Sequence, residues 1–104
     1  MKIQYNTDKT VNGNQKHQDY FSTQIAEQLA RFQSDISRIE VHISDENGKK
    51  EGSNNIRCLL EARIEGKQPF AVSCMADTID LAVNGAIDKL KASLETTIGR
   101  QNND

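Results

Sequence analysis

The sequence predicts an α+β domain in which a four-stranded sheet carries two helices packed on one face. Two amphipathic helical patterns and four segments of alternating apolar and polar residues support this prediction. In chain order they give strand, helix, strand, strand, strand, helix (β-α-β-β-β-α). The 104 residues suffice for one compact domain with a single core, which we assign to residues 1–100, followed by a short disordered tail at 101–104.

The N-terminal third predicts a strand and then a helix. Residues 2–6 alternate, with Ile3 and Tyr5 on the same side, which is typical of a half-buried strand. A polar stretch with the turn signal Asn12-Gly13 follows. From residue 15 to about residue 33, the residues of one helical stripe recur at steps of three and four, which predicts an amphipathic helix. The stripe consists of His17, Phe21, Ile25, Leu29 and Phe32.

Three further strands are predicted at residues 37–44, 56–64 and 70–76, where apolar side chains again alternate with polar ones. The connections at 45–55 and 65–69 are polar and glycine-containing, so we expect hairpins between neighbouring antiparallel strands. If Ile64 lies opposite Gln68, Cys58 pairs directly with Cys74.

The longest helical pattern covers residues 77–100. We expect Asp77 to cap the first turn and Gly99 to end the helix. This helix needs a broad apolar partner, which the sheet supplies. Its buried stripe should contain Ile79, Val83, Ala86, Ile87, Leu90, Leu94 and Ile98. The opposite sheet face would then be a mixed-charge surface compatible with solvent, carrying Lys2, Gln4, Arg38, Glu40, His42, Arg57, Glu61, Arg63, Ser73 and Met75.

Composition narrows the classes of function. The net charge of −2 argues against indiscriminate binding to nucleic acid or anionic membranes, so a nucleic-acid role must rest on a local patch. The chain shows neither an apolar run long enough to span a membrane nor the apolar stretch of a signal peptide near Met1. We therefore expect a cytoplasmic protein without a membrane partner.

Few residues suggest chemistry. Cys58 and Cys74 could touch, which allows a redox switch, but small buried core residues are the favoured interpretation in a reducing cytosol. His17 and His42 have no further histidine or cysteine at metal-ligand spacing. No catalytic triad, phosphate-binding loop or carboxylate pair can be placed on neighbouring elements. We expect no enzyme activity, metal, cofactor or small-molecule substrate.

The cations of the predicted helices leave two interpretations open. They could form an ordinary charged surface, because Asp88 and Glu95 are interspersed with them, or they could contact nucleic acid. The candidate residues are Lys16, Arg31, Lys89, Lys91 and Arg100.

Three segments carry a resemblance to a known family. Residues 38–47 (RIEVHISDEN), 57–63 (RCLLEAR) and 82–90 (AVNGAIDKL) are similar in pattern to the ribosome hibernation-promoting factor family, as is the element order from Ile3 to Arg100. The resemblance implies a fold like that of a double-stranded-RNA-binding domain. It also places Lys89 where the family has a lysine that contacts rRNA.

The function that this resemblance implies is steric. Such a protein binds the small ribosomal subunit through its rRNA near the decoding centre and inhibits translation during stress or hibernation, with no catalysis. The candidate helix cations would contact rRNA phosphates. The alternative is a protein-interaction module that keeps the fold but has lost rRNA binding, which the net negative charge favours.

Overall fold

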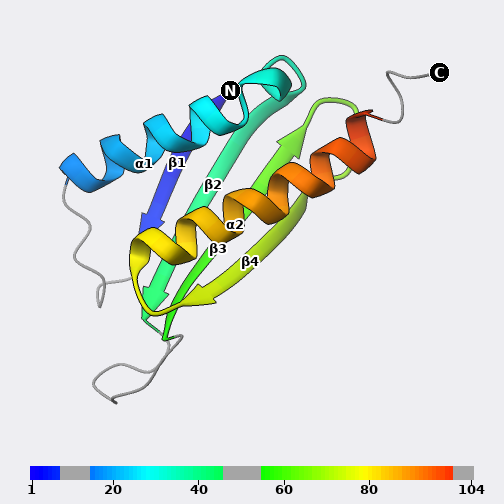
Figure 1. Cartoon of the computed structure of the whole chain (residues 1–104). Coiled ribbons are helices and arrows are strands. Elements are labelled where there is room, and N and C mark those ends of the chain that lie inside the picture. Colours follow the sequence, from blue (N-terminus) through cyan, green and yellow to red (C-terminus); the bar gives the residue numbers. More distant parts are fainter. Residues whose placement is uncertain (8–14, 46–54, 100–104) are drawn as a thin grey trace.

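A computed structural model describes residues 1–7, 15–45 and 55–99 (Figure 1). The predicted turn at 12–13, most of the loop at 45–55, Arg100 and the tail at 101–104 lie outside the described residues. The elements in chain order are β1 (Lys2–Thr7), α1 (Gln15–Gln28), the 3₁₀ turn η1 (Ala30–Phe32), β2 (Ile36–Asp45), β3 (Ile56–Ile64), β4 (Phe70–Ala76), α2 (Ile79–Leu94) and the π-helical turn η2 (Glu95–Gly99). This order confirms the predicted β-α-β-β-β-α fold.

The sheet is mixed and keeps the strands in chain order, β1-β2-β3-β4. β1 is parallel to β2, while the β2–β3 and β3–β4 pairs are antiparallel. A parallel pair requires a crossover, which α1 provides, whereas the later strands follow one another directly. Figure 1 shows α1 and α2 side by side on the same face of the sheet. Neither of the described helices covers the opposite face, which is called the open face below.

The core lies between the two helices and the sheet. Alternation puts every second strand residue on the helix side, and the helical stripes meet them there. Burial of each large aliphatic side chain stabilises the fold by about 1.5–3 kcal/mol. The largest fully buried side chains are Ile25, Leu29, Ile36, Ile39, Val41, Cys58, Leu60, Val83, Ile87, Leu90 and Leu94.

β2 contains an irregularity that the sequence pattern did not predict. The pairing with β3 runs Ile36 to Ile64 and then Arg38 to Arg63, so β2 has one extra residue, Ser37. The bulge changes the side-chain alternation, because Ile36 and Ile39 are both buried although three residues apart. The Ser37 hydroxyl donates to the Arg63 carbonyl at 3.1 Å and holds the bulge in place.

The helix ends differ from the predicted ones. α1 ends at Gln28 and is followed by η1, rather than continuing to residue 33. α2 begins at Ile79, and its N-cap is Thr78, not Asp77. The Thr78 hydroxyl accepts a hydrogen bond from the Leu81 amide at 3.2 Å, because its extended backbone places the side chain over the first turn.

Cys58 and Cys74 lie directly opposite each other on β3 and β4, as the hairpin register predicts. Both are free thiols, and burial raises the pKa of Cys58 to about 12. Cys74 packs beneath α2 at Gly85, where an added Cβ would clash with the Cys74 sulfur and lie 3.3 Å from its Cβ. Gly85 thus allows the helix to approach β4 closely.

Replacing Gly85 with alanine should therefore destabilise the fold. We expect Gly85→Ala to lower the free energy of unfolding by about 1–3 kcal/mol through overpacking, despite the higher helix propensity of alanine. The measurement is urea unfolding. The exposed neighbour Asn84 supplies the control, since Asn84→Ala should be neutral or slightly stabilising. Adding Cys74→Ala should recover part of the loss, and a Gly85→Ala variant as stable as wild type would contradict this packing.

Candidate functional site

Arg31 is the candidate cation at the C-terminal side of α1. Its Nη1 donates to Glu95 Oε1 at 3.1 Å, which joins η1 to η2, and both side chains are more than half exposed. The guanidinium also lies 4.8 Å from the centre of the Phe32 ring. An exposed ion pair of this kind adds little to stability. Arg31 is thus accessible, but a carboxylate partly neutralises it.

Lys89 and Lys91 both lie on α2, but their side chains contact different elements. Lys89 Nζ donates to the Ser73 carbonyl at 2.8 Å and so lies over β4, an edge strand. Lys91 Nζ donates to Gln28 Oε1 at 3.3 Å and links α2 to the end of α1. Each lysine therefore has a partner within the chain, on a different element.

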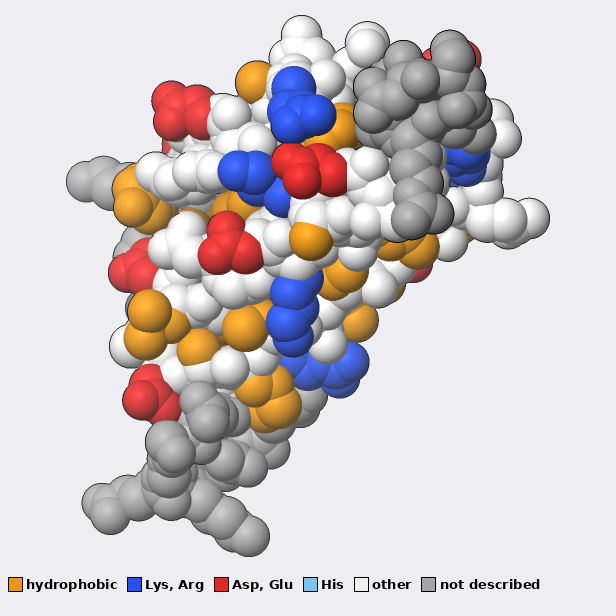
Figure 2. Space-filling model, turned by 45° about the vertical axis from the view of Figure 1, so that its right-hand side comes forward, with side chains coloured by type: hydrophobic (Ala, Val, Ile, Leu, Met, Phe, Trp, Pro, Cys, Tyr) orange, Lys and Arg blue, Asp and Glu red, His pale blue; other side chains and the backbone are white. Residues whose placement is uncertain are grey.

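Three of the five predicted cations, Arg31, Lys89 and Lys91, have side chains that the structure describes, and these three do not share one position. The structure places Arg31 and Lys91 near the join between the helices and Lys89 at the β4 edge, while the Lys16 side chain and Arg100 lie outside the described part. In Figure 2, Lys and Arg side chains alternate with Asp and Glu over this view. The described side chains of the helices and helical turns include three cations and five carboxylates. The carboxylates are those of Asp19, Glu27, Asp80, Asp88 and Glu95.

On the open face of the sheet, in contrast, cations outnumber carboxylates. The strand residues of this face include four cations and two glutamates, and strand pairing fixes their relative positions. Lys2 pairs with Arg38, and Arg38 pairs with Arg63, so three adjacent strands place three cations in one row. The next row contains Glu40 opposite Glu61, and Arg57 lies near the far end of β3. The sequence pattern predicted a mixed-charge face compatible with solvent and did not predict this row.

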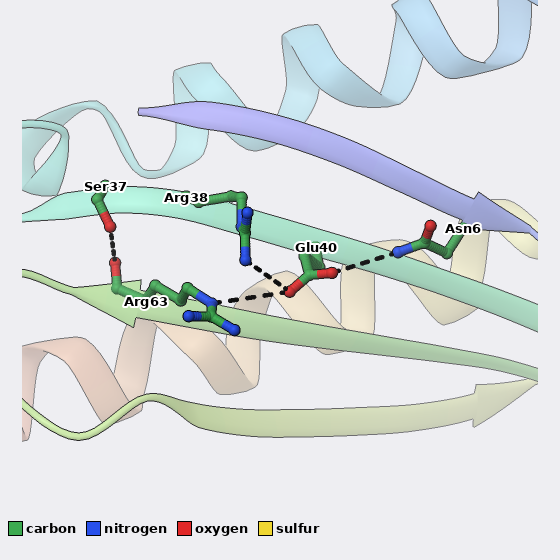
Figure 3. A network of polar contacts seen from close by, with 5 residues as sticks. All are labelled: Asn6, Ser37, Arg38, Glu40 and Arg63. Atoms are coloured by element: carbon green, nitrogen blue, oxygen red, sulfur yellow. Dashed lines mark hydrogen bonds and ion pairs between the residues drawn. The ribbon is translucent and has the colours of Figure 1, made fainter.

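Glu40 is the centre of a polar network on this face (Figure 3). Its Oε2 accepts from Arg38 Nη2 at 3.4 Å and lies 3.8 Å from Arg63 Nε. Its Oε1 accepts from Asn6 Nδ2 at 3.4 Å. Figure 3 shows the side chains of Asn6, Arg38, Glu40 and Arg63 converging from three strands, with the helices behind the sheet. One carboxylate thus orients two guanidiniums.

The surroundings of Glu40 favour its ionised form. Hydrogen bonding to the Glu61 carboxyl, when Glu61 carries the proton, makes the largest contribution, and the charges of Arg38 and Arg63 add to it, so the pKa of Glu40 is lowered from its ordinary value of 4.5. Burial acts in the opposite direction without outweighing them. Glu40 is therefore a carboxylate at neutral pH, and both arginines keep their partner.

Within the described ranges, no three His, Cys, Asp or Glu side chains come together as metal ligands. Among the helices that the structure describes, none is long and apolar enough to cross a membrane.

Comparison with known proteins gives structural matches only. No family model and no curated protein matches the sequence. The N-terminal domain of Thermus thermophilus Protein Y is similar in structure, with a TM-score of 0.74 and 16% identity over 93% of this chain and 99% of that one. A ribosomal subunit interface protein from Coxiella burnetii gives a TM-score of 0.62 and 17% identity, over 95% and 99% of the two chains. The chain therefore has the fold of these proteins, which confirms the structural part of the predicted resemblance.

The Glu40 network predicts a specific pH dependence. Because the folded-state pKa of Glu40 is lowered, its contribution to stability is complete above the ordinary pKa of 4.5 and is lost as the pH falls through the lower folded value. We expect the free energy of unfolding to fall less between about pH 7 and about pH 3 in Glu40→Gln than in wild type. Urea unfolding at both pH values measures this.

The exposed Glu27 provides the matched control for that experiment. Glu27→Gln removes the same charge from α1 and should keep the acid dependence of the wild type. If both variants lose the same free energy of unfolding as wild type on acidification, the network does not stabilise the ionised form of Glu40.

Proposed function

We propose that this protein is a ribosome-associated stress or hibernation factor that binds the small ribosomal subunit through its rRNA and inhibits translation. The observation that carries the proposal is the structural likeness to the Protein Y N-terminal domain over 93% of this chain. The likeness to a ribosomal subunit interface protein supports it. Both solved structures share the whole described fold, not one motif.

The proposed inhibition is steric. A compact domain that occupies the binding space of messenger and transfer RNA blocks translation without a chemical step. The layered core supports this role, because the helices and the sheet share one buried cluster and so form one compact unit. No cofactor, metal or small-molecule substrate is part of the proposal.

We further propose the helix cations as one rRNA contact. Arg31 and Lys91 are the best placed of the described candidates, because each lies near the junction of η1 and α1 with the end of α2. Lys and Arg side chains position a protein on nucleic acid mainly by contacting phosphates. The full candidate set remains Lys16, Arg31, Lys89, Lys91 and Arg100.

The alternative function is a protein-interaction module that keeps the fold without rRNA binding. The excess of carboxylates over cations on the described helices favours it. Nuclease treatment separates the two proposals, since a protein partner remains bound after digestion of RNA whereas an rRNA-mediated association is lost.

Co-sedimentation tests the proposed function directly. Purified protein should sediment with small ribosomal subunits at low and moderate salt, and addition of the protein should reduce translation in a purified system. Binding should weaken as salt rises, because phosphate contacts release counterions. Failure to sediment with the subunits even at low salt would refute the proposal.

If the helix cations contact rRNA, their removal should reduce the salt dependence of binding to the small subunit. We expect the double variant Arg31→Gln/Lys91→Gln to bind small subunits more weakly, with the slope of log affinity against log salt reduced by roughly two units if each cation contacts one phosphate. Its melting temperature should change little, because both partners are at the surface. Lys67→Gln, in the β3–β4 turn, is the control for loss of a cation elsewhere. An unchanged affinity in the double variant would exclude this contact.

A further inference from the structure

We propose that the open face of the sheet binds the phosphate backbone of double-helical RNA. The inference rests on the proposed function and deepens it, because it assigns the main RNA contact to the face opposite the helices. It adds residues of the sheet, Lys2, Arg38, Arg57 and Arg63, to the candidate cations of the helices.

The first argument is the separation of charge between the two layers. The open face has four cations and two carboxylates, whereas the described helical elements have three cations and five carboxylates. The whole chain has a net charge of −2. A polyanion is thus attracted more strongly to the sheet than to the outer helix surface, so charge complementarity favours the sheet face for the main contact.

The second argument is the row formed by Lys2, Arg38 and Arg63. Neighbouring strands lie about 4.7–4.9 Å apart, so three paired cations span roughly 10 Å on a rigid surface. Like charges directly opposite each other destabilise a sheet. Glu40 offsets only part of this repulsion, and an anion bound along the row would offset the rest.

The third argument is the positioning of the two arginines. Glu40 holds Arg38 and Arg63 through one oxygen (Figure 3), and the bulge at Ser37 sets the register that puts these arginines opposite each other. Arg38 Nε is buried and makes no hydrogen bond with the described residues. β-Bulges commonly re-aim side chains at functional sites. Held guanidiniums lose less conformational freedom when they bind phosphate than free ones would.

The composition of the face indicates which RNA it fits. Its described strand residues include no Phe, Tyr or Trp, and His42 is the one aromatic ring among them, so this face lacks the group of aromatic side chains on which successive unpaired bases stack. Instead, neutral polar side chains such as Gln4, Asn6 and Ser73 accompany the cations. These groups suit phosphates and 2′-hydroxyls, which a duplex presents on its outside.

The test uses two double variants with the same loss of charge on opposite faces. Lys2→Gln/Arg63→Gln removes the two exposed ends of the cation row and leaves the Arg38–Glu40 contact intact. Arg31→Gln/Lys91→Gln is the matched helix variant. The probes are an RNA duplex of about 16 base pairs, a single strand of the same length, and purified small ribosomal subunits. Binding is measured across a salt series, and circular dichroism confirms that both variants are folded.

We expect the sheet variant, Lys2→Gln/Arg63→Gln, to bind the duplex about tenfold more weakly than wild type at low salt. The slope of its log affinity against log salt should be smaller by roughly two units. The helix variant should lose less affinity, and wild type should prefer the duplex to the single strand. Equal duplex affinity of the sheet variant and wild type would overturn the inference, as would a preference for the single strand. A protein partner that binds through Lys2 and Arg63, with no duplex binding at low salt, would overturn the RNA assignment.

The measurements with small ribosomal subunits distinguish a failure of this inference from a failure of the proposed function. If wild type and the sheet variant sediment equally with small subunits and bind the duplex equally, the inference fails and the proposed function stands. If the sheet variant loses duplex binding but wild type does not sediment with subunits, the sheet face still binds RNA and the ribosomal proposal fails.

Discussion

The burial of α2 against β3 and β4 is the interaction on which the rest of the structure depends. The helix contributes one continuous apolar stripe, from Val83 to Leu94, and each large side chain in it stabilises the fold by about 1.5–3 kcal/mol. Gly85 over Cys74 lets the helix approach the strand closely. Because α1 uses the same side of the sheet, no described helix or strand covers the opposite face, which we propose as the surface for a partner.

This layering also separates the charges. The outer surfaces of the helices and the open face of the sheet are built from different residues, so a chain with a net negative charge can still present one basic face. The helix cations Arg31, Lys89 and Lys91 each contact a group on another element, which makes them links within the fold as well as candidate contacts. The arginines of the sheet are instead held in a row by strand pairing.

Glu40 connects stability with function in this arrangement. An acidic residue in a basic row weakens the attraction for RNA, yet it reduces the repulsion between Arg38 and Arg63 and fixes their guanidiniums. Its lowered pKa reflects the hydrogen bond with Glu61 and these two cations. The same network thus links the ionisation of Glu40 with the positions of the proposed phosphate contacts.

The sequence by itself determined the element order, the apolar faces and the pairing of Cys58 with Cys74, because periodicity and hairpin counting depend only on local geometry. Only the tertiary structure decided the bulge at Ser37, the cap at Thr78 and the row of Lys2, Arg38 and Arg63. The row joins residues from three strands, and its parallel β1–β2 register is set by packing across the sheet, which no local pattern records. For the same reason Lys89 and Lys91, which are close in the sequence, have partners on different elements, Ser73 and Gln28.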